Sequence, residues 1–238
     1  MEEYRFLRKG ETAPAGRAYV GHVSCPGFLR DADWMRTLDL PLTLVLPPLP
    51  EWFFEAAMAL VSALSQGEGF ECSVNDFGAL LAIAERFPNV PLAAGPLLLP
   101  QDTDPLLYEF CRSTDAGTPV WTQTGAAELR WREPSEACKH HWQEPSVFSA
   151  WELLRECGVS RLEFCAQPLM PQTAPPMPVS VYRMSMLSAL PCRSCTACAA
   201  LPTPTRAGKP LLHDKNLIWY ADDAPAPAFA DRMIWTST

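Results

Sequence analysis

The sequence lacks any apolar run approaching the roughly 20 residues that a helix needs to cross a bilayer, so we expect no membrane span. Its first residues, Met1-Glu2-Glu3-Tyr4-Arg5, are too polar and acidic to begin a secretory signal. Basic residues are also scarce, since 19 lysines and arginines face 27 aspartates and glutamates, for a net charge of −8. This balance argues against a generic electrostatic grip on nucleic acid. We therefore expect a cytoplasmic protein.

Repeats and protease motifs are absent as well. The sequence contains no solenoid-type repeat, no nucleophile elbow and no zinc-protease helix motif. The number of cysteines is nine, so they cannot all pair. An odd number without a signal peptide fits a reducing compartment better than a disulfide framework. Clustered cysteines in such a compartment indicate a metal, and scattered ones indicate core positions.

What the sequence does contain is an alternation of strand-like and helix-like segments. With 238 residues, 48% of them hydrophobic, the chain can bury a sizeable core. Helices are predicted over 29–38 and 51–65, after Asn75 or Asp76 as N-cap, from Asp104, and between Ser146 and Gly158. Strands are predicted at 18–23, 42–46, 70–74, 91–95, 120–121, 128–131, 161–165 and 179–182.

Strand–helix alternation predicts a parallel sheet, because parallel neighbours require crossover connections. About eight strands favour an α/β, TIM-barrel-like fold, irregular or incomplete in places, over residues 1–185. The last third differs, with crowded prolines over 168–178, three clustered cysteines and two short predicted strands at 217–220 and 232–235. We expect residues 186–238 to form a small Pro/Cys-rich extension packed on the barrel.

The clustered cysteines are Cys192, Cys195 and Cys198, a C-x2-C-x2-C array. Two-residue gaps let successive thiolates converge on one centre, and soft thiolates select zinc or iron–sulfur clusters. The array predicts a metal centre, with a [4Fe–4S] cluster favoured and structural zinc as the alternative. A fourth ligand must then come from elsewhere, or one iron stays open.

Cys25 is the predicted fourth ligand. It follows the first predicted strand, 18–23, and Cys192 follows the last predicted barrel strand, 179–182. In a closed barrel of those strands the first and last would be neighbours, and both cysteines would lie at the end where barrel active sites are built. Cys165 is the reserve ligand, and His213 keeps a Cys3His zinc site open.

Several short motifs occur in an order that resembles the peptidase U32 family, and more closely its short, single-domain iron–sulfur branch. They are the strand leading to Cys25, the turn Asn75-Asp76-x-Gly78, the segments 94–98 and 103–105, and Asn216-x-x-x-Tyr220 after the cysteine array. The resemblance implies a TIM-barrel-like fold with a four-cysteine [4Fe–4S] cluster at its mouth. It also implies a role in oxygen-independent hydroxylation, or a related redox modification, of a quinone precursor or RNA with a U32-like or redox partner protein.

Three other polar residues are candidate substrate ligands. Asn75 and Asp76 follow a predicted strand at the end where barrel enzymes place functional groups, although a helix cap needs the same residue types. Glu163 either faces the barrel interior, where it can bind substrate or a proton, or faces outward and pairs with Arg161. Two other functions remain open: a non-catalytic binding or scaffold subunit with a structural metal, and a peptidase-type hydrolase.

Overall fold

The computed structural model of the chain describes residues 1–98, 118–120, 130–132, 151–166, 177–189, 205–206, 209–210, 212–214, 217–221 and 227–235. Eight of the strands in these ranges form one parallel sheet, in the order β1-β15-β9-β8-β5-β4-β3-β2. They are β1 (Glu2–Arg5), β2 (Ala18–Gly21), β3 (Leu42–Leu46), β4 (Glu71–Val74), β5 (Leu92–Ala94), β8 (Val159–Cys165), β9 (Val179–Tyr182) and β15 (Arg232–Trp235).

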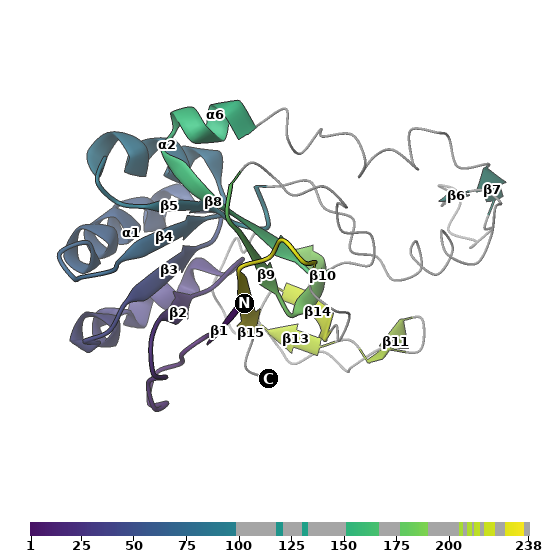
Figure 1. Cartoon of the computed structure of the whole chain (residues 1–238), viewed down its shortest axis with the longest axis horizontal. Helices are drawn as coiled ribbons and strands as arrows, with labels where there is room; N and C mark the ends of the chain where they lie inside the picture. Colours follow the sequence, from purple (N-terminus) through teal and green to yellow (C-terminus); the bar gives the residue numbers. More distant parts are fainter. Residues whose placement is uncertain are drawn as a thin grey trace.

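The sheet closes into a barrel between its two outer strands, β1 and β2. Phe6 and Tyr19 form a parallel bridge there, and the Leu7 N–H donates to the Tyr19 carbonyl oxygen over 2.8 Å. Around the barrel the strands therefore follow one another in chain order, as in a TIM barrel. The predicted TIM-barrel-like α/β fold is confirmed (Figure 1).

Both faces of β3, β4, β5 and β9 are buried, which explains why sequences such as Leu42–Leu46 are continuously apolar. Leu44 belongs to the outer apolar cluster between sheet and helices, whereas the next residue, Val45, belongs to an inner cluster with Tyr19 and Tyr182. Successive side chains of a strand point to opposite faces, so one run supplies both clusters. The inner cluster fills the upper barrel, at the carboxyl ends of the strands.

Two helices that the sequence predicts cover the first half of the barrel. The helix α1 (Glu51–Leu64) begins after Pro50 and turns Ala57, Met58 and Val61 toward the sheet. The second, α2 (Phe77–Arg86), begins at Asp76, whose Oδ1 accepts from the Ala79 N–H over 3.1 Å, as a helix N-cap does. Both stand on the outer face of the sheet with α6 (Trp151–Glu156) (Figure 1).

The segment predicted as a helix over 29–38 is instead two 3-10 turns, η1 (Pro26–Asp31) and η2 (Asp33–Thr37). Neither turn has a side-chain cap hydrogen bond. The predicted helix from Asp104 lies outside the described residues, as do Ser146 and the first part of the helix expected before Gly158. None of the helices in the described ranges is long and apolar enough to span a membrane.

Two strand predictions were misplaced. The strands near 120 and 130, counted toward the barrel, are β6 (Thr118–Val120) and β7 (Arg130–Arg132), which pair only with each other among the described strands. Their places in the barrel belong to β1, which the sequence analysis missed, and β15, which it assigned to the extension. The extension boundary at 185/186 therefore separates β15 from the sheet in which it lies.

A small antiparallel sheet stands beside the barrel mouth. It contains β10 (Met184–Ala189), β14 (Leu217–Ala221) and β13 (Leu212–Asp214), in that order (Figure 1). The chain passes from β9 into β10 through Arg183 alone, so the small sheet grows directly from the barrel. A further pair, β11 (Thr205–Arg206) and β12 (Lys209–Pro210), is antiparallel.

Candidate functional site

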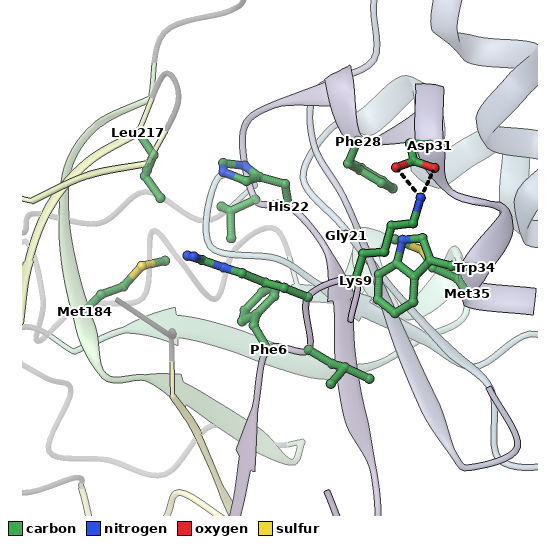
Figure 2. A pocket seen from close by; sticks show the side chains of 13 residues that line it. Phe6, Lys9, Gly21, His22, Phe28, Asp31, Trp34, Met35, Met184 and Leu217 are labelled. Atoms are coloured by element: carbon green, nitrogen blue, oxygen red, sulfur yellow. Dashed lines mark hydrogen bonds and ion pairs between the residues drawn. The ribbon is translucent and has the colours of Figure 1, made fainter. Parts of the chain in front are cut away.

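A cavity of about 480 Å³ opens at the carboxyl ends of β1 and β2, the end where barrel enzymes hold their active sites. Its size falls in the range typical of small-molecule sites. Figure 2 shows two unlike ends, with Phe28, Trp34 and Met35 at one and His22, Met184 and Leu217 at the other. The lining is Phe6, Leu7, Arg8, Lys9, Gly21, His22, Val23, Phe28, Asp31, Trp34, Met35, Met184 and Leu217.

Gly21 sets the shape of the cavity wall at the end of β2. Its φ is +101°, and a Cβ there would lie 2.3 Å from the carbonyl oxygen of Val45. No side chain fits that space, so only glycine lets the chain turn here. The turn brings the following residue, His22, to the cavity.

The His22 ring is fixed in one tautomer. Its Nδ1 accepts from the backbone N–H groups of Ser24, over 3.0 Å, and Cys25, over 2.9 Å. A nitrogen that accepts two N–H groups carries no hydrogen, so the neutral ring bears its hydrogen on Nε2. The Nε2 of His22 therefore bears a hydrogen and is buried, so it is not set up to bind a metal. The sequence pattern alone gave no functional role to His22.

An ion pair crosses the rim at the aromatic end. Lys9 Nζ lies 2.8 Å from both Oδ1 and Oδ2 of Asp31, which joins the β1–β2 connection to the end of η1 (Figure 2). The side chains are 59% and 67% exposed, and exposed pairs contribute little stability. The pair lies at the exposed edge of the cavity.

Below the cavity, Glu163 lies fully buried in the barrel centre. It accepts hydrogen bonds from the hydroxyls of Ser73 over 2.5 Å, Tyr182 over 2.8 Å and Tyr19 over 3.2 Å. The interior alternative for Glu163 is thus the one found, and Arg161 instead contacts Asp231 over 2.5 Å and Glu71 over 3.8 Å.

Burial raises the pKa of Glu163 to about 7, and the Glu71 carboxylate adds to the rise. The three hydroxyl hydrogen bonds favour the charged form and oppose this shift. Glu163 can therefore hold or release a proton near neutral pH. It does not line the cavity, because the Phe6 ring packs between them, against Tyr19 and Tyr182 at 5.9 and 6.0 Å between centroids.

Charged side chains fill the barrel interior at the amino ends of the strands. Glu71 is 6% exposed and accepts from Arg232 over 2.8 and 3.1 Å and from the Thr43 hydroxyl over 2.9 Å. Barrel interiors are usually filled by branched apolar side chains, so this polar layer is unusual. This layer fills the lower end of the barrel, and the cavity described above lies at the upper end.

Asn75 and Asp76 hold neighbouring strand ends together. The Asn75 amide donates to the Leu46 carbonyl oxygen over 2.9 Å and accepts from the Leu97 N–H over 3.0 Å. Asp76 caps α2 and also accepts from the Leu49 N–H over 2.7 Å. Both side chains thus bind backbone groups of this molecule. A role in substrate binding stays a prediction for them, as it does for Glu163.

Two of the candidate cysteine ligands fall in the described residues. Cys25 follows β2 and is 1% exposed, and Cys165 ends β8 and is 0% exposed, so both lie at the upper end of the barrel. The other three, Cys192, Cys195 and Cys198, lie outside the described residues, as does the side chain of His213. Within the described part of the chain, no group of three potential metal ligands occurs.

The predicted route from Cys25 to the cysteine array was wrong. It required β2 and β9 to be neighbours, but β1 and β15 lie between them. The polar strand β1 was not predicted, and β15 was predicted in the extension, so neither was expected between β2 and β9.

The structure describes the residues on either side of the segment that carries the array. Ala189, at the end of β10, pairs with Leu217 of β14, and Leu217 lines the same cavity as His22. His22 in turn accepts the N–H of Cys25. Both ends of the segment that carries the array are therefore paired next to this cavity.

Comparison of the chain with protein-family models, with curated proteins and with solved structures finds no match. The resemblance to the peptidase U32 family therefore depends on the short motifs alone. Of these, Asn75, Asp76 and Gly95 have a structural explanation in the joined strand ends, because a Cβ at Gly95 would lie 2.5 Å from Asn75 Oδ1.

Proposed function

We propose that this protein holds a [4Fe–4S] cluster at the mouth of its barrel, with Cys192, Cys195, Cys198 and Cys25 as ligands. The observation that carries the proposal is the C-x2-C-x2-C array in a segment that starts beside the mouth. Cys192 comes three residues after Ala189, and three extended residues span about 10 Å. Ala189 pairs with Leu217, and Leu217 lines the cavity near Cys25. This pair supports a position for Cys192 close to the cavity and Cys25.

The donor set fits such a cluster chemically. Thiolates are soft ligands, which favour iron–sulfur clusters and zinc over hard cations. Cys25 and Cys165 are both buried at the upper end of the barrel, and Cys165 lies in an apolar cluster with Val45 and Met184. An apolar surround limits solvent access to a metal site and so tunes its potential. Cys165 is the alternative fourth ligand.

The cluster would supply one-electron transfer, and the protein residues would bind the substrate and handle its proton. We propose oxygen-independent hydroxylation or a related redox modification, carried out with a partner protein that delivers or accepts electrons. The substrate is a small molecule such as a quinone precursor, or RNA. This role follows from the resemblance to the U32 family, and Glu163, with a pKa of about 7, can exchange a proton near neutral pH but does not line the cavity.

Metal analysis of protein purified without oxygen tests the proposal. We expect a brown protein that absorbs near 400 nm and contains about four irons and four acid-labile sulfides per chain. A colourless protein with one zinc per chain would instead support the scaffold alternative and overturn the iron–sulfur proposal.

Single cysteine variants identify the ligands. Cys195→Ser and Cys25→Ser should each lower the iron content, whereas Cys72→Ser should not, because Cys72 belongs to the outer core between sheet and helices. Circular dichroism checks that each variant folds. Full iron in Cys25→Ser together with loss in Cys165→Ser would move the fourth ligand to Cys165.

A further inference from the structure

We propose that the cavity between the ends of β1 and β2 binds a small, uncharged aromatic molecule. The rings of Phe6, Phe28 and Trp34 would contact its ring system, together with Met35 and Met184. Such binding needs no metal, so iron content and ligand binding can each be found without the other.

The polar side chains of the lining already have partners within this molecule. Among the lining residues that the structure describes, these side chains are Arg8, Lys9, His22 and Asp31. Lys9 and Asp31 bind each other, with Lys9 Nζ 2.8 Å from both carboxylate oxygens. The charge of Lys9 is thereby balanced, and Arg8 also has an interaction of its own within the chain.

Both ring nitrogens of His22 are engaged or buried. Its Nδ1 accepts the N–H groups of Ser24 and Cys25, and its Nε2 has almost no accessible surface. A charged ligand would therefore give up its hydration without gaining a counterion or a hydrogen-bond donor from these side chains. Burying a charge without such compensation is costly, so the lining favours an uncharged molecule.

Three aromatic rings of the lining are only partly buried. Phe28 and Trp34 pack against the outer apolar cluster and Phe6 packs against the inner one, yet each of the three keeps some exposed surface. Figure 2 shows Phe28 and Trp34 together at one end of the cavity. Covering apolar surface is favourable, so a ligand that covers these rings gains binding free energy.

The chemistry of this surface favours an aromatic ring over an aliphatic one. Aromatic rings attract one another in stacked or edge-to-face contacts, beyond the effect of the buried area. Met35 and Met184 add thioether sulfurs, which make favourable contacts with aromatic rings. The volume of about 480 Å³ is in the range of small-molecule sites, so the cavity suits a small ring system.

Isothermal titration of the full chain at pH 7 with three probes of the same fused-ring skeleton tests the proposal. The probe 2-naphthol is aromatic and uncharged, 2-naphthoate is aromatic and anionic, and decahydro-2-naphthol is uncharged and saturated. We expect 2-naphthol to bind at least about tenfold more tightly than 2-naphthoate, because the carboxylate loses its hydration in the cavity. It should bind roughly two- to tenfold more tightly than decahydro-2-naphthol, because only an aromatic ring gains the ring–ring contacts.

Phe28→Leu locates the binding. Leucine keeps an apolar side chain but removes the ring, so 2-naphthol should bind roughly two- to tenfold more weakly and decahydro-2-naphthol about as tightly as before. The matched control is Phe54→Leu, because Phe54 is also partly buried against the outer cluster but does not line the cavity. It should change neither affinity.

Four results would overturn the proposal. The first is 2-naphthoate binding as tightly as 2-naphthol, or more tightly, and the second is equal affinity for 2-naphthol and decahydro-2-naphthol. The third is no binding of 2-naphthol at millimolar concentration. The fourth is a loss of 2-naphthol affinity in Phe28→Leu no larger than in Phe54→Leu, which would place the binding elsewhere. Should Phe28→Leu fail to fold, Trp34→Leu takes its place, with Trp52→Leu as control, because Trp52 is 64% exposed and does not line the cavity.

Discussion

At the scale of single residues, Glu163 couples the stability of the barrel to pH. Its pKa is about 7 in the folded protein and near the ordinary value of 4.5 in the unfolded chain. Below pH 4.5 both states are protonated, and between pH 4.5 and 7 the unfolded chain loses the proton first. The free energy of unfolding therefore falls as pH rises through this window, by up to about 1.4 kcal/mol per pH unit.

Glu163→Gln should remove this slope, because the amide keeps the shape of the side chain and does not titrate. Urea unfolding at pH 5, 6, 7 and 8 measures it as the difference between variant and wild type. Glu55→Gln is the control, since Glu55 is 76% exposed in its pair with Arg86. A Glu163→Gln protein with the wild-type slope would contradict the assignment.

Gly95 shows how one glycine holds a polar side chain in place. A Cβ there would lie 2.5 Å from Asn75 Oδ1, and the Asn75 amide cannot move without losing its bonds to Leu46 and Leu97. Gly95→Ala should lower the free energy of unfolding by about 1–3 kcal/mol. Gly67→Ala is the control, because its nearest contact is an ordinary 3.4 Å. Equal losses in both variants would show that the Asn75 contact is not the cause.

At the scale of elements, a buried ion pair ties the last strand to the far side of the barrel. Arg232 of β15 and Glu71 of β4 lie 2.8 Å apart, and both side chains are buried or nearly so; three strands separate β15 from β4 in the sheet. Removing Arg232 leaves the buried Glu71 carboxylate with only the more distant Arg161, 3.8 Å away, so Arg232→Met should cost about 3 kcal/mol. The exposed counterpart Arg86→Met should cost less than about 1 kcal/mol.

A double-mutant cycle checks the origin of that cost. Adding Glu71→Gln to Arg232→Met should recover part of the loss, because the buried carboxylate is then gone. Urea unfolding of the four proteins at one pH measures the coupling. Strictly additive losses would mean that the pair does not join the two strands energetically.

The same elements show what the sequence could and could not predict. Leu42–Leu46 and Val179–Tyr182 were found with the observed bounds, because strands buried on both faces are continuously apolar and proline ends the first. The strand β1 was missed because Glu2, Glu3 and Arg5 make it polar, although Tyr4 packs against the inner cluster. The partners of β15 could not be read from local pattern, since register with β1 joins opposite ends of the chain.

For the candidate site, the sequence identified cysteines by ligand chemistry and could not identify the cavity. Cys25 was correctly predicted at the carboxyl ends of the strands. The reason for choosing it was wrong, because β2 and β9 are not neighbours. Gly21 shapes the cavity through its positive φ, and His22 is held by two hydrogen bonds from backbone N–H groups. Such features depend on three-dimensional geometry, and a glycine followed by a histidine at a strand end was their only signal.

At the scale of the whole molecule, the barrel is held unevenly around its circumference. Between β1 and β2 it closes through the Phe6–Tyr19 bridge and the Leu7 hydrogen bond, whereas β3 and β4 pair over four residues. The strand β1 is also largely exposed. Local opening follows the least protected contacts, so the amides of Leu7 and β1 should exchange with solvent at least about tenfold faster than those of β3 and β4.

Hydrogen exchange followed by mass spectrometry measures this difference on overlapping peptides. Protection as strong at Leu7 as at Leu44 would mean that the barrel opens elsewhere.

The cavity spans this same weak closure, since Phe6 to Lys9 line it from one side and Gly21 to Val23 from the other. A molecule held by both sides fits only the closed ring of strands, so binding and closure are one equilibrium. At a free ligand concentration of 100 times Kd it would add roughly 2.7 kcal/mol to the free energy of unfolding. A bound ligand would then hold β1 and β2 together, so the Leu7 amide would exchange most slowly in the ligand-bound protein. A hydrogen-exchange map would thus detect a ligand before its chemistry is known.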